Sequence, residues 1–229
     1  MLTLRPAAQR GTTNFVWLDS RHTFSFGDYY DPDQNHFRAL RVINDDRIAA
    51  GGGFPTHPHR DMEILTFVLS GAIAHRDSMG TVGTVNAGEW QYMSAGTGVA
   101  HSEFNPSATD PTHLLQFWLV PDKKGYAPRY AQKSFADAPQ GQWATVATPD
   151  GRDGSLAIRQ DVVLSTAKLR PGDELTYAFA PGRGGWLHLA TDTATVNGLS
   201  LTAGDALAIT DMATVTVTGD GEVLLFDLA

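Results

Sequence analysis

The chain has 229 residues, of which 42% are hydrophobic, so it can bury one large core or two smaller ones. Its 17 lysines and arginines against 25 aspartates and glutamates give a formal net charge of −8, which argues against nucleic acid or an anionic membrane as a direct ligand. It contains no cysteine, which excludes disulfides, thiolate catalysis, zinc fingers and iron–sulfur clusters. Histidines and carboxylates remain as the strong metal-binding side chains.

The first eleven residues contain two arginines and no apolar run long enough for a signal-peptide core. No later stretch approaches the roughly 20 apolar residues that span a membrane. We therefore expect a soluble, cytoplasmic protein with no membrane association.

Short runs rich in valine, isoleucine, threonine, phenylalanine and tryptophan then alternate with many of the 23 glycines and 12 prolines. Such runs are typical of strands, and the clearest lie at residues 40–44, 64–69, 89–93, 114–120, 214–218 and 222–228. Helical periodicity is weak throughout, and we expect only a turn or two of helix near residues 130–138. The spacing predicts an all-β sandwich or barrel.

The sharpest local signal is GGGFPTHPH at residues 51–59, followed by Glu63. Side chains at i and i+2 of an extended chain point to one face, so His57 and His59 can reach a single ion. Pro58 favours an edge or strand-entry position, which suits the mouth of a barrel. The glycines do not indicate a phosphate-binding loop, because no Lys-Ser/Thr follows them.

His101 and Glu103 repeat the same-face spacing after the glycine-bearing turn at residues 94–98. The two pairs together supply three imidazoles and one carboxylate, a set that suits Fe(II), Mn(II), Ni(II), Cu(II) or Zn(II) better than magnesium or calcium. Glu63 lies four residues beyond His59 and has the same strand parity. Spacing alone therefore leaves open which acid is the fourth ligand.

The second half of the chain echoes the first, since VNAGEW at residues 85–90 resembles LTAGDA at residues 201–206. Residues 121–130 contain two prolines and a glycine and read as a linker or long loop. We predict two tandem barrels, residues 1–135 and residues 136–229. Seven of the eight histidines precede residue 114, so the metal site is expected in the first barrel and the second is expected to lack metal ligands.

Several stretches are similar to the pirin family in its bacterial form: RHTFSFGDYY (residues 21–30), LRVIN (40–44), HPHRDME (57–63), HRDSMG (75–80) and SAGTGVAHSE (94–103). The similarity is dense from about Trp17 to Leu119. It is looser in the second half, where VNG at 196–198, AGD at 203–205 and LLFD at 224–227 also match.

The resemblance implies a bicupin fold, with two tandem β-barrels of the double-stranded β-helix or jelly-roll type. It also implies one mononuclear metal per chain, usually iron, in the N-terminal barrel. The family's ligands fall on His57, His59, His101 and Glu103. General cupins use the acid at the Glu63 position instead, and the pirin match favours Glu63 as a structural or second-shell acid.

The resemblance further implies quercetin dioxygenase activity, in which dioxygen opens the central ring of the flavonol and carbon monoxide is lost. Glu103 would accept the proton of the metal-bound flavonol hydroxyl. A flat aromatic substrate needs apolar walls, for which Phe54, Met93 and Trp118 are candidates, although each could instead belong to the barrel core. Gln116 lies two residues before Trp118 and is a candidate for supporting the site.

Two other functions fit the same residues. Eukaryotic pirins are regarded as iron-dependent transcriptional co-regulators, so the chain could be a non-enzymatic iron or redox sensor that acts through a protein partner. It could also be a cupin isomerase or another metal enzyme with a different small substrate. We expect a monomer, and we expect the remaining histidines to be hydrogen-bonded rather than metal-bound: His22, His36, His75, His113 and His188.

Overall fold

The computed structural model describes residues 1–229, and its regular secondary structure is almost entirely β-strand, as the all-β prediction requires. Its helical content is two three-residue 3-10 turns, η1 (Ala7–Gln9) and η2 (Arg152–Gly154). No helix has the length and apolar character needed to cross a membrane. The chain divides into two compact units, which we call the first barrel (Gly11–Ala136) and the second barrel (Met1–Arg10 with Asp137–Ala229).

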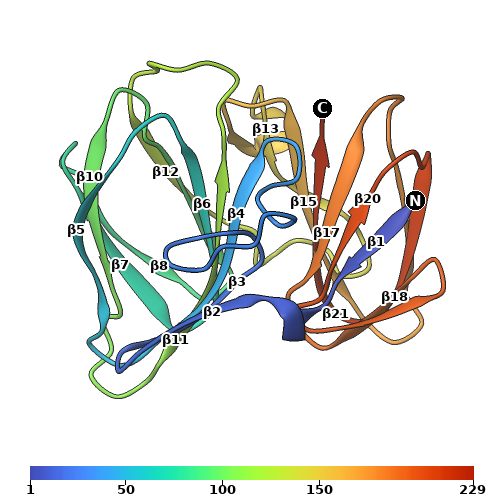
Figure 1. Cartoon of the computed structure of the whole chain (residues 1–229), viewed down its shortest axis with the longest axis horizontal. Helices are drawn as coiled ribbons and strands as arrows, with labels where there is room; N and C mark the ends of the chain where they lie inside the picture. Colours follow the sequence, from blue (N-terminus) through green and yellow to red (C-terminus); the bar gives the residue numbers. More distant parts are fainter. The chain divides into compact units, whose positions relative to one another are not determined.

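The first barrel consists of two antiparallel sheets (Figure 1). Leu18, Ile48, Val68 and Leu114 from one sheet share a buried cluster with Ile73 and Val85 from the other, so the sheets pack face to face. The seven-stranded sheet has the order β12 (Arg129–Ser134), β9 (Glu89–Ser94), β6 (Glu63–Ser70), β11 (Thr112–Leu119), β4 (Leu40–Ile48), β3 (Leu18–His22), β2 (Gly11–Phe15). The four-stranded sheet has the order β5 (Gly53–His59), β10 (Val99–Phe104), β7 (Ala72–Asp77), β8 (Val82–Asn86).

The second barrel has a core made mostly of leucine, valine and isoleucine. Its main sheet has the order β1 (Leu2–Arg5), β20 (Ala206–Ile209), β17 (Gly184–Leu189), β21 (Thr214–Leu228), β15 (Val162–Leu169), β13 (Ala144–Thr148), β14 (Leu156–Ala157). The strands β16 (Glu174–Ala178) and β18 (Thr193–Val196) pair with β21, and β19 (Leu199–Thr202) pairs with β18.

The boundary between the two barrels lies after Ala136, one residue beyond the division predicted after residue 135. The structure also assigns the first ten residues to the second barrel. The reason is β1, which pairs along its length with β20, from Leu2 opposite Ile209 to Arg5 opposite Ala206. In Figure 1 this blue N-terminal strand accordingly lies among the orange and red strands.

The helix predicted near residues 130–138 is wrong. Residues Arg129–Ser134 form strand β12, which pairs antiparallel with β9 from Arg129 opposite Ser94 to Ser134 opposite Glu89. The partner strand supplies the backbone hydrogen bonds, so tertiary pairing overrides the local pattern. The predicted runs at 214–218 and 222–228 also form one strand, β21, instead of two.

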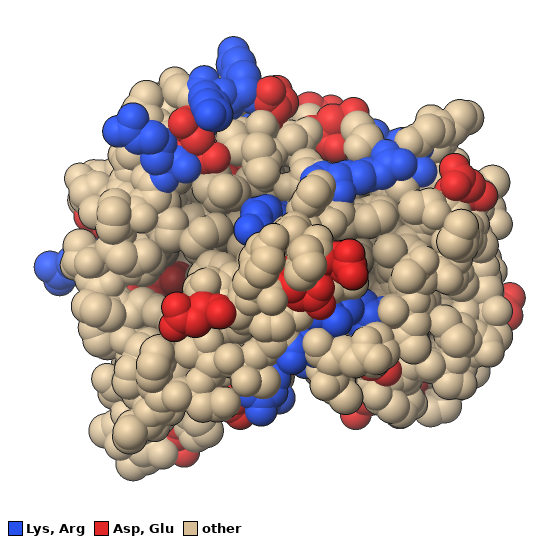
Figure 2. All heavy atoms as spheres, viewed as in Figure 1, with Lys and Arg blue, Asp and Glu red and all other residues tan.

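Charged side chains on the face drawn in Figure 2 occur in small groups of both signs, separated by broad uncharged areas. A single-sign surface would be expected to attract an oppositely charged macromolecule over a distance. The visible face instead has mixed charges, in keeping with the excess of only 8 negative charges over 229 residues.

Candidate metal centre

Two paired strands bring together the histidines of the two sequence motifs. β5 and β10 run antiparallel with His101 opposite His57 and Val99 opposite His59. Residues directly opposite each other in a pair point to the same face of the sheet. The strand β10 alternates between buried and less buried residues, so His101 and Glu103 point inward while Ser102 points the other way.

The three imidazoles converge through the same ring atom. The Nε2 atom of His101 lies 3.0 Å from Nε2 of His59 and 3.1 Å from Nε2 of His57. Nδ1 of His57 donates a 2.8 Å hydrogen bond to the carbonyl oxygen of Pro55, so the Nε2 atom of this neutral ring turns a lone pair toward the cluster. A metal–nitrogen bond of about 2.1 Å and a right angle between ligands would separate two nitrogens by about 3.0 Å. The arrangement therefore fits a single ion bound by all three rings.

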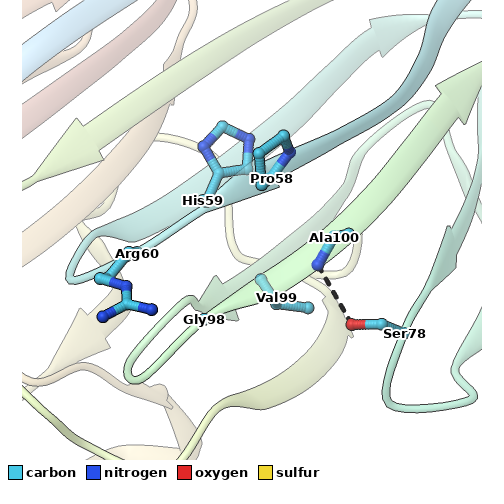
Figure 3. Close-up of a pocket in the computed structure, with 7 residues that line it drawn as sticks. All are labelled: Pro58, His59, Arg60, Ser78, Gly98, Val99 and Ala100. Atoms are coloured by element: carbon cyan, nitrogen blue, oxygen red, sulfur yellow. Dashed lines mark hydrogen bonds between the residues drawn. The ribbon is translucent and has the colours of Figure 1, made fainter.

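Figure 3 shows the end of this strand pair, where Pro58 and His59 of β5 lie near Val99 and Ala100 of β10. The backbone N–H of Ala100 donates a 3.1 Å hydrogen bond to Oγ of Ser78, which fixes the turn after β7 against β10. Around these residues lies an open hollow of about 480 Å³ that also includes Arg60. The hollow gives solvent a route to the edge of the histidine cluster.

Glu103 is held in place by two glutamines from the facing sheet. Its Oε1 accepts a short hydrogen bond from Gln91 of β9, and its Oε2 accepts a 3.0 Å hydrogen bond from Gln116 of β11. Trp118 donates in turn to the side-chain oxygen of Gln116, and Tyr130 donates to that of Gln91. Glu103 is only 3% exposed, so these donors fix its carboxylate, which lies near His75 and His101.

His75 joins the site from β7, where it lies opposite Glu103. Its Nδ1 is 3.4 Å from Nδ1 of His101, and its Nε2 is 3.1 Å from Oδ2 of Asp77. Ligand atoms of His75, His101 and Glu103 also lie within 4.8 Å of one another, so they form a second possible metal-binding group. His75 meets the ring nitrogen of His101 that points away from the three-histidine cluster, which is the place of a ligand's supporting partner.

Burial keeps the central histidines neutral. Burial, together with the neighbouring His101 and His57, lowers the pKa of His59 to about 4. Burial, together with His57 and His75, lowers the pKa of His101 to about 3. Metal ions bind the unprotonated ring, so both side chains are in the binding form at neutral pH.

The comparisons with known proteins agree with this geometry. The family model described as Pirin matches residues 3–119, and the model described as Quercetinase C-terminal cupin domain matches residues 145–228. The chain is 50% identical over its whole length to a protein of Escherichia coli strain K12 named quercetin 2,3-dioxygenase, of which it covers 99%. This chain belongs to the pirin family.

Solved structures of relatives give the same result for the fold of this pirin. A crystal structure of YhhW from E. coli superposes with a TM-score of 0.97 at 50% identity, covering 100% of this chain and 98% of that one. The structure of the bacterial pirin YhhW in complex with nickel(II) gives a TM-score of 0.96 at 49% identity, covering 100% and 99%. The predicted bicupin fold is confirmed, and a divalent metal and a metal-dependent dioxygenase are supported.

A cavity of about 390 Å³ opens beside the histidines of this pirin, within the range of about 300–1,000 Å³ typical of small-molecule sites. Phe54, Gln116 and Trp118, three of the residues proposed for the pocket, line it together with His57 and His59. Its walls also include residues that the sequence did not indicate for the pocket: Thr13, Phe15, Leu18, Ser20, His22, Phe26, Gly27, Asp28, Asn44, Asp46, Pro55 and Thr56.

Met93, the fourth residue proposed for the pocket, does not line the cavity. Its side chain is 1% exposed and packs with Ile64, Ala95 and Val99 in a separate buried cluster. Met93 points to the same face of β9 as Gln91, two residues before it, but lies further along the strand, opposite Ile64, whereas Gln91 reaches Glu103. Met93 is therefore a core residue.

Glu63, the alternative acid, is fully buried and hydrogen-bonded elsewhere. Its two oxygens accept hydrogen bonds from the hydroxyl groups of Tyr92 and Ser94. Neither metal-binding group of the structure includes Glu63. Its carboxylate therefore accepts hydrogen bonds that link β6 to β9.

The remaining histidines have varied surroundings. Nδ1 of His22 is 2.8 Å from Oδ1 of Asn44, and Nε2 of His113 is 2.7 Å from Oδ1 of Asp45. His36 is exposed, and His188 is fully buried in the second barrel. Of these histidines, only His75 contacts the cluster, and the sequence analysis did not predict this role. Asp77, two residues away on the same strand face, was the sequence feature that could have indicated it.

Proposed function

We propose that this pirin is an iron-dependent quercetin 2,3-dioxygenase that opens the central ring of the flavonol and releases carbon monoxide. The observation that carries the proposal is the convergence of three imidazole nitrogens beside a buried carboxylate, next to a largely apolar cavity. The full-length similarity to the E. coli protein named quercetin 2,3-dioxygenase supports the choice of substrate.

In the proposed site His57, His59 and His101 would hold one Fe(II) ion through Nε2, and Glu103 would hold it through a carboxylate oxygen. The 3.0 and 3.1 Å separations between ring nitrogens would let one ion bind all three rings. When bound, the ion supplies Lewis acidity toward the flavonol hydroxyl and the electron-transfer chemistry that dioxygen requires.

Glu103 has the role of base in this proposal. The O–H bond of the flavonol 3-hydroxyl breaks, and its proton forms an O–H bond with the Glu103 carboxylate. Gln91 and Gln116 orient that carboxylate through their amide hydrogens. Because Glu103 is buried, water is excluded from the proton's path.

The cavity walls orient the flat substrate. Trp118 meets His59 edge-on, with ring centroids 4.9 Å apart and an interplanar angle of 86°. Phe54 lies near His57 on the other motif strand, with ring centroids 6.3 Å apart. Two aromatic rings next to these histidines give a flat aromatic ligand apolar surface to pack against.

The test is an anaerobic loading of the purified chain with Fe(II), followed by quercetin and air, with flavonol loss and carbon monoxide measured together. One iron per chain and carbon monoxide in proportion to flavonol are expected for the wild type. His101→Ala is expected to lose both, while His36→Ala, an exposed histidine outside the site, is expected to keep both. Parallel loading with Ni(II) and Mn(II) tests the choice of iron.

Two outcomes would contradict parts of the proposal. If one iron binds and the flavonol persists, the metal site stands and the activity falls, which would favour the non-enzymatic sensor. If Ni(II) or Mn(II) supports faster turnover than Fe(II), the activity stands and the choice of iron is wrong.

A further inference from the structure

The cavity beside the histidines is lined by both apolar and polar side chains. The apolar ones are Phe15, Leu18, Phe26, Phe54 and Trp118. The polar ones, which we call the polar wall, lie on three neighbouring strands: Thr13 of β2, Ser20 and His22 of β3, and Asn44 and Asp46 of β4. A ligand that fills the cavity therefore meets an array of hydrogen-bonding groups as well as aromatic rings.

Strand register explains why these polar side chains share one face. Ser20 lies opposite Asp46, and His22 lies opposite Asn44, in the antiparallel pair of β3 and β4. Gln116 of β11 lies opposite Asn44 on the other side. Because directly opposite residues point to the same face, the array continues toward the glutamine that holds Glu103.

His22 and one oxygen of Asp46 already have hydrogen-bond partners within the protein, whereas the other oxygen of Asp46 has none. His22 is 2.8 Å from the hydroxyl of Thr13 through Nε2, and 2.8 Å from Oδ1 of Asn44 through Nδ1. Asp46 receives a hydrogen bond from Ser20. Its other oxygen, Oδ1, is buried and has no hydrogen-bond partner, although the side chain lines the cavity.

A buried carboxylate oxygen without a partner costs free energy, so it is expected to be satisfied when the site is in use. Burial, together with the charges of Asp45 and Glu103, raises the pKa of Asp46 to about 7, and the Ser20 hydrogen bond offsets this only in part. An anionic group brought to this wall would meet further negative charge. A neutral hydroxyl suits the position, because it can donate to Oδ1 without adding charge.

We propose that Asp46 is a specificity-determining residue, whose Oδ1 accepts a hydrogen bond from a ring hydroxyl of the substrate other than the hydroxyl that binds the metal. This inference rests on the proposed function for the class of ligand, a hydroxylated aromatic compound. It makes the polar wall the part of the cavity that distinguishes polyhydroxylated flavonols from simpler ones.

The test compares quercetin with 3-hydroxyflavone, which keeps the hydroxyl and keto oxygens of the flavonol's central ring but lacks its other hydroxyls. Binding to the Ni(II)-loaded chain is measured without oxygen, from quenching of tryptophan fluorescence, so that no turnover is needed. Wild type is expected to bind quercetin more tightly. Asp46→Leu is expected to weaken quercetin binding about tenfold, equivalent to about 1.4 kcal/mol, and to leave 3-hydroxyflavone binding unchanged.

Two further variants keep the test decisive. Asp46→Asn retains a carbonyl acceptor of the same shape and is expected to keep most of the preference for quercetin, even if Asp46→Leu folds poorly. Asp45→Asn is the matched control, since Asp45 is the residue before Asp46 on β4, faces the other way and pairs with His113 and Arg47. It is expected to keep the full preference.

The proposal is overturned if Asp46→Leu and Asp46→Asn weaken both flavonols by the same factor, or weaken neither. Its failure is distinguishable from that of the proposed function. A wild-type chain that binds quercetin selectively through Asp46 but releases no carbon monoxide in air would remove the dioxygenase and leave this inference standing. A chain that turns quercetin over, with binding insensitive to Asp46, would do the reverse.

Discussion

Glu63 and Glu103 each lie an even number of residues after a motif histidine, Glu63 four after His59 and Glu103 two after His101. Their neighbours in the fold give the two acids different roles. Glu63 meets two hydroxyl donors in a wall that faces no histidine cluster. Burial, with the charge of Glu63 next, raises the pKa of Tyr92, which keeps its hydroxyl a donor. Glu103 meets two amide donors and lies within ligand distance of His101.

This difference predicts opposite effects for two matched substitutions. Glu103→Gln is expected to weaken Ni(II) or Fe(II) binding by more than about 100-fold, because the proposed carboxylate ligand is lost. Glu63→Gln is expected to leave metal binding unchanged and to lower the free energy of unfolding by about 1–3 kcal/mol, because a buried hydrogen bond is lost. Competition with a chromogenic chelator and urea unfolding measure the two effects. An exchange of the two phenotypes would make Glu63 the ligand.

His75 gives a second prediction at the scale of single residues. His75→Phe keeps a ring that can stack on Tyr130, whose centroid lies 4.6 Å away, but removes the contact with Nδ1 of His101. Metal affinity is expected to fall about 10–100-fold with the fold retained. His113→Phe removes an equivalent histidine–aspartate pair outside the site and is the control. Equal affinity in the two variants would show that His75 does not position His101.

The two motif pairs could be predicted because their spacing is local in the sequence. A strand turns His57 and His59, or His101 and Glu103, to one face whatever the rest of the chain does. The contributions of His75, Gln91 and Asp46 could not be predicted in this way. Each depends on which strands lie side by side and in what register, and that is decided by tertiary packing.

At the scale of secondary-structure elements, the two similar segments at residues 85–90 and 201–206 correspond to a turn that occurs once in each barrel. Gly88 lies between β8 and β9, and Gly204 lies between β19 and β20, with φ values of 82° and 88°. Only glycine adopts this conformation without strain, so the repeated glycine could be read as a turn from the sequence. β12 was missed because an edge strand of this kind is defined by its partner, β9.

Asp205, beside the second of these turns, gives a prediction about pH. Burial would raise its pKa, but hydrogen bonds from Ala7 and Thr202 outweigh this and hold it below the usual value. The ionised form therefore stabilises the fold at pH values above the ordinary range of an aspartate, about 3.9, and this contribution is lost as the pH falls through the lower folded-state pKa.

Asp205→Ala is accordingly expected to lower the free energy of unfolding at pH 7 by about 1 kcal/mol, after allowance for solvent screening. The difference in the free energy of unfolding between variant and wild type is expected to become smaller below about pH 4. Urea unfolding at pH 7, 5 and 3.5 measures it. Asp192→Ala, next to the same hairpin, is a control, and a gap that widens at low pH would contradict the assignment.

At the scale of the whole molecule, each barrel has its own buried core, and both candidate metal-binding groups belong to the first barrel. Saturating Ni(II), at about 100 times its dissociation constant, is expected to stabilise that barrel by about 2.7 kcal/mol. Scanning calorimetry is expected to show one transition that moves upward with metal and another that does not, with no movement in His101→Ala. Equal movement of the whole profile would mean that the barrels unfold together.

The pairing of β1 with β20 also has a consequence for how the protein is made. Residues 11–136 contain every strand of the first barrel, so this unit can fold while the ribosome is still adding the rest. The second barrel cannot do the same, because its edge strand β1 is synthesised before the first barrel and its partner, Ala206–Ile209, after it. Residues 1–10 must therefore stay unpaired while the first barrel is made, and they join their sheet only once Ala206–Ile209 has been added.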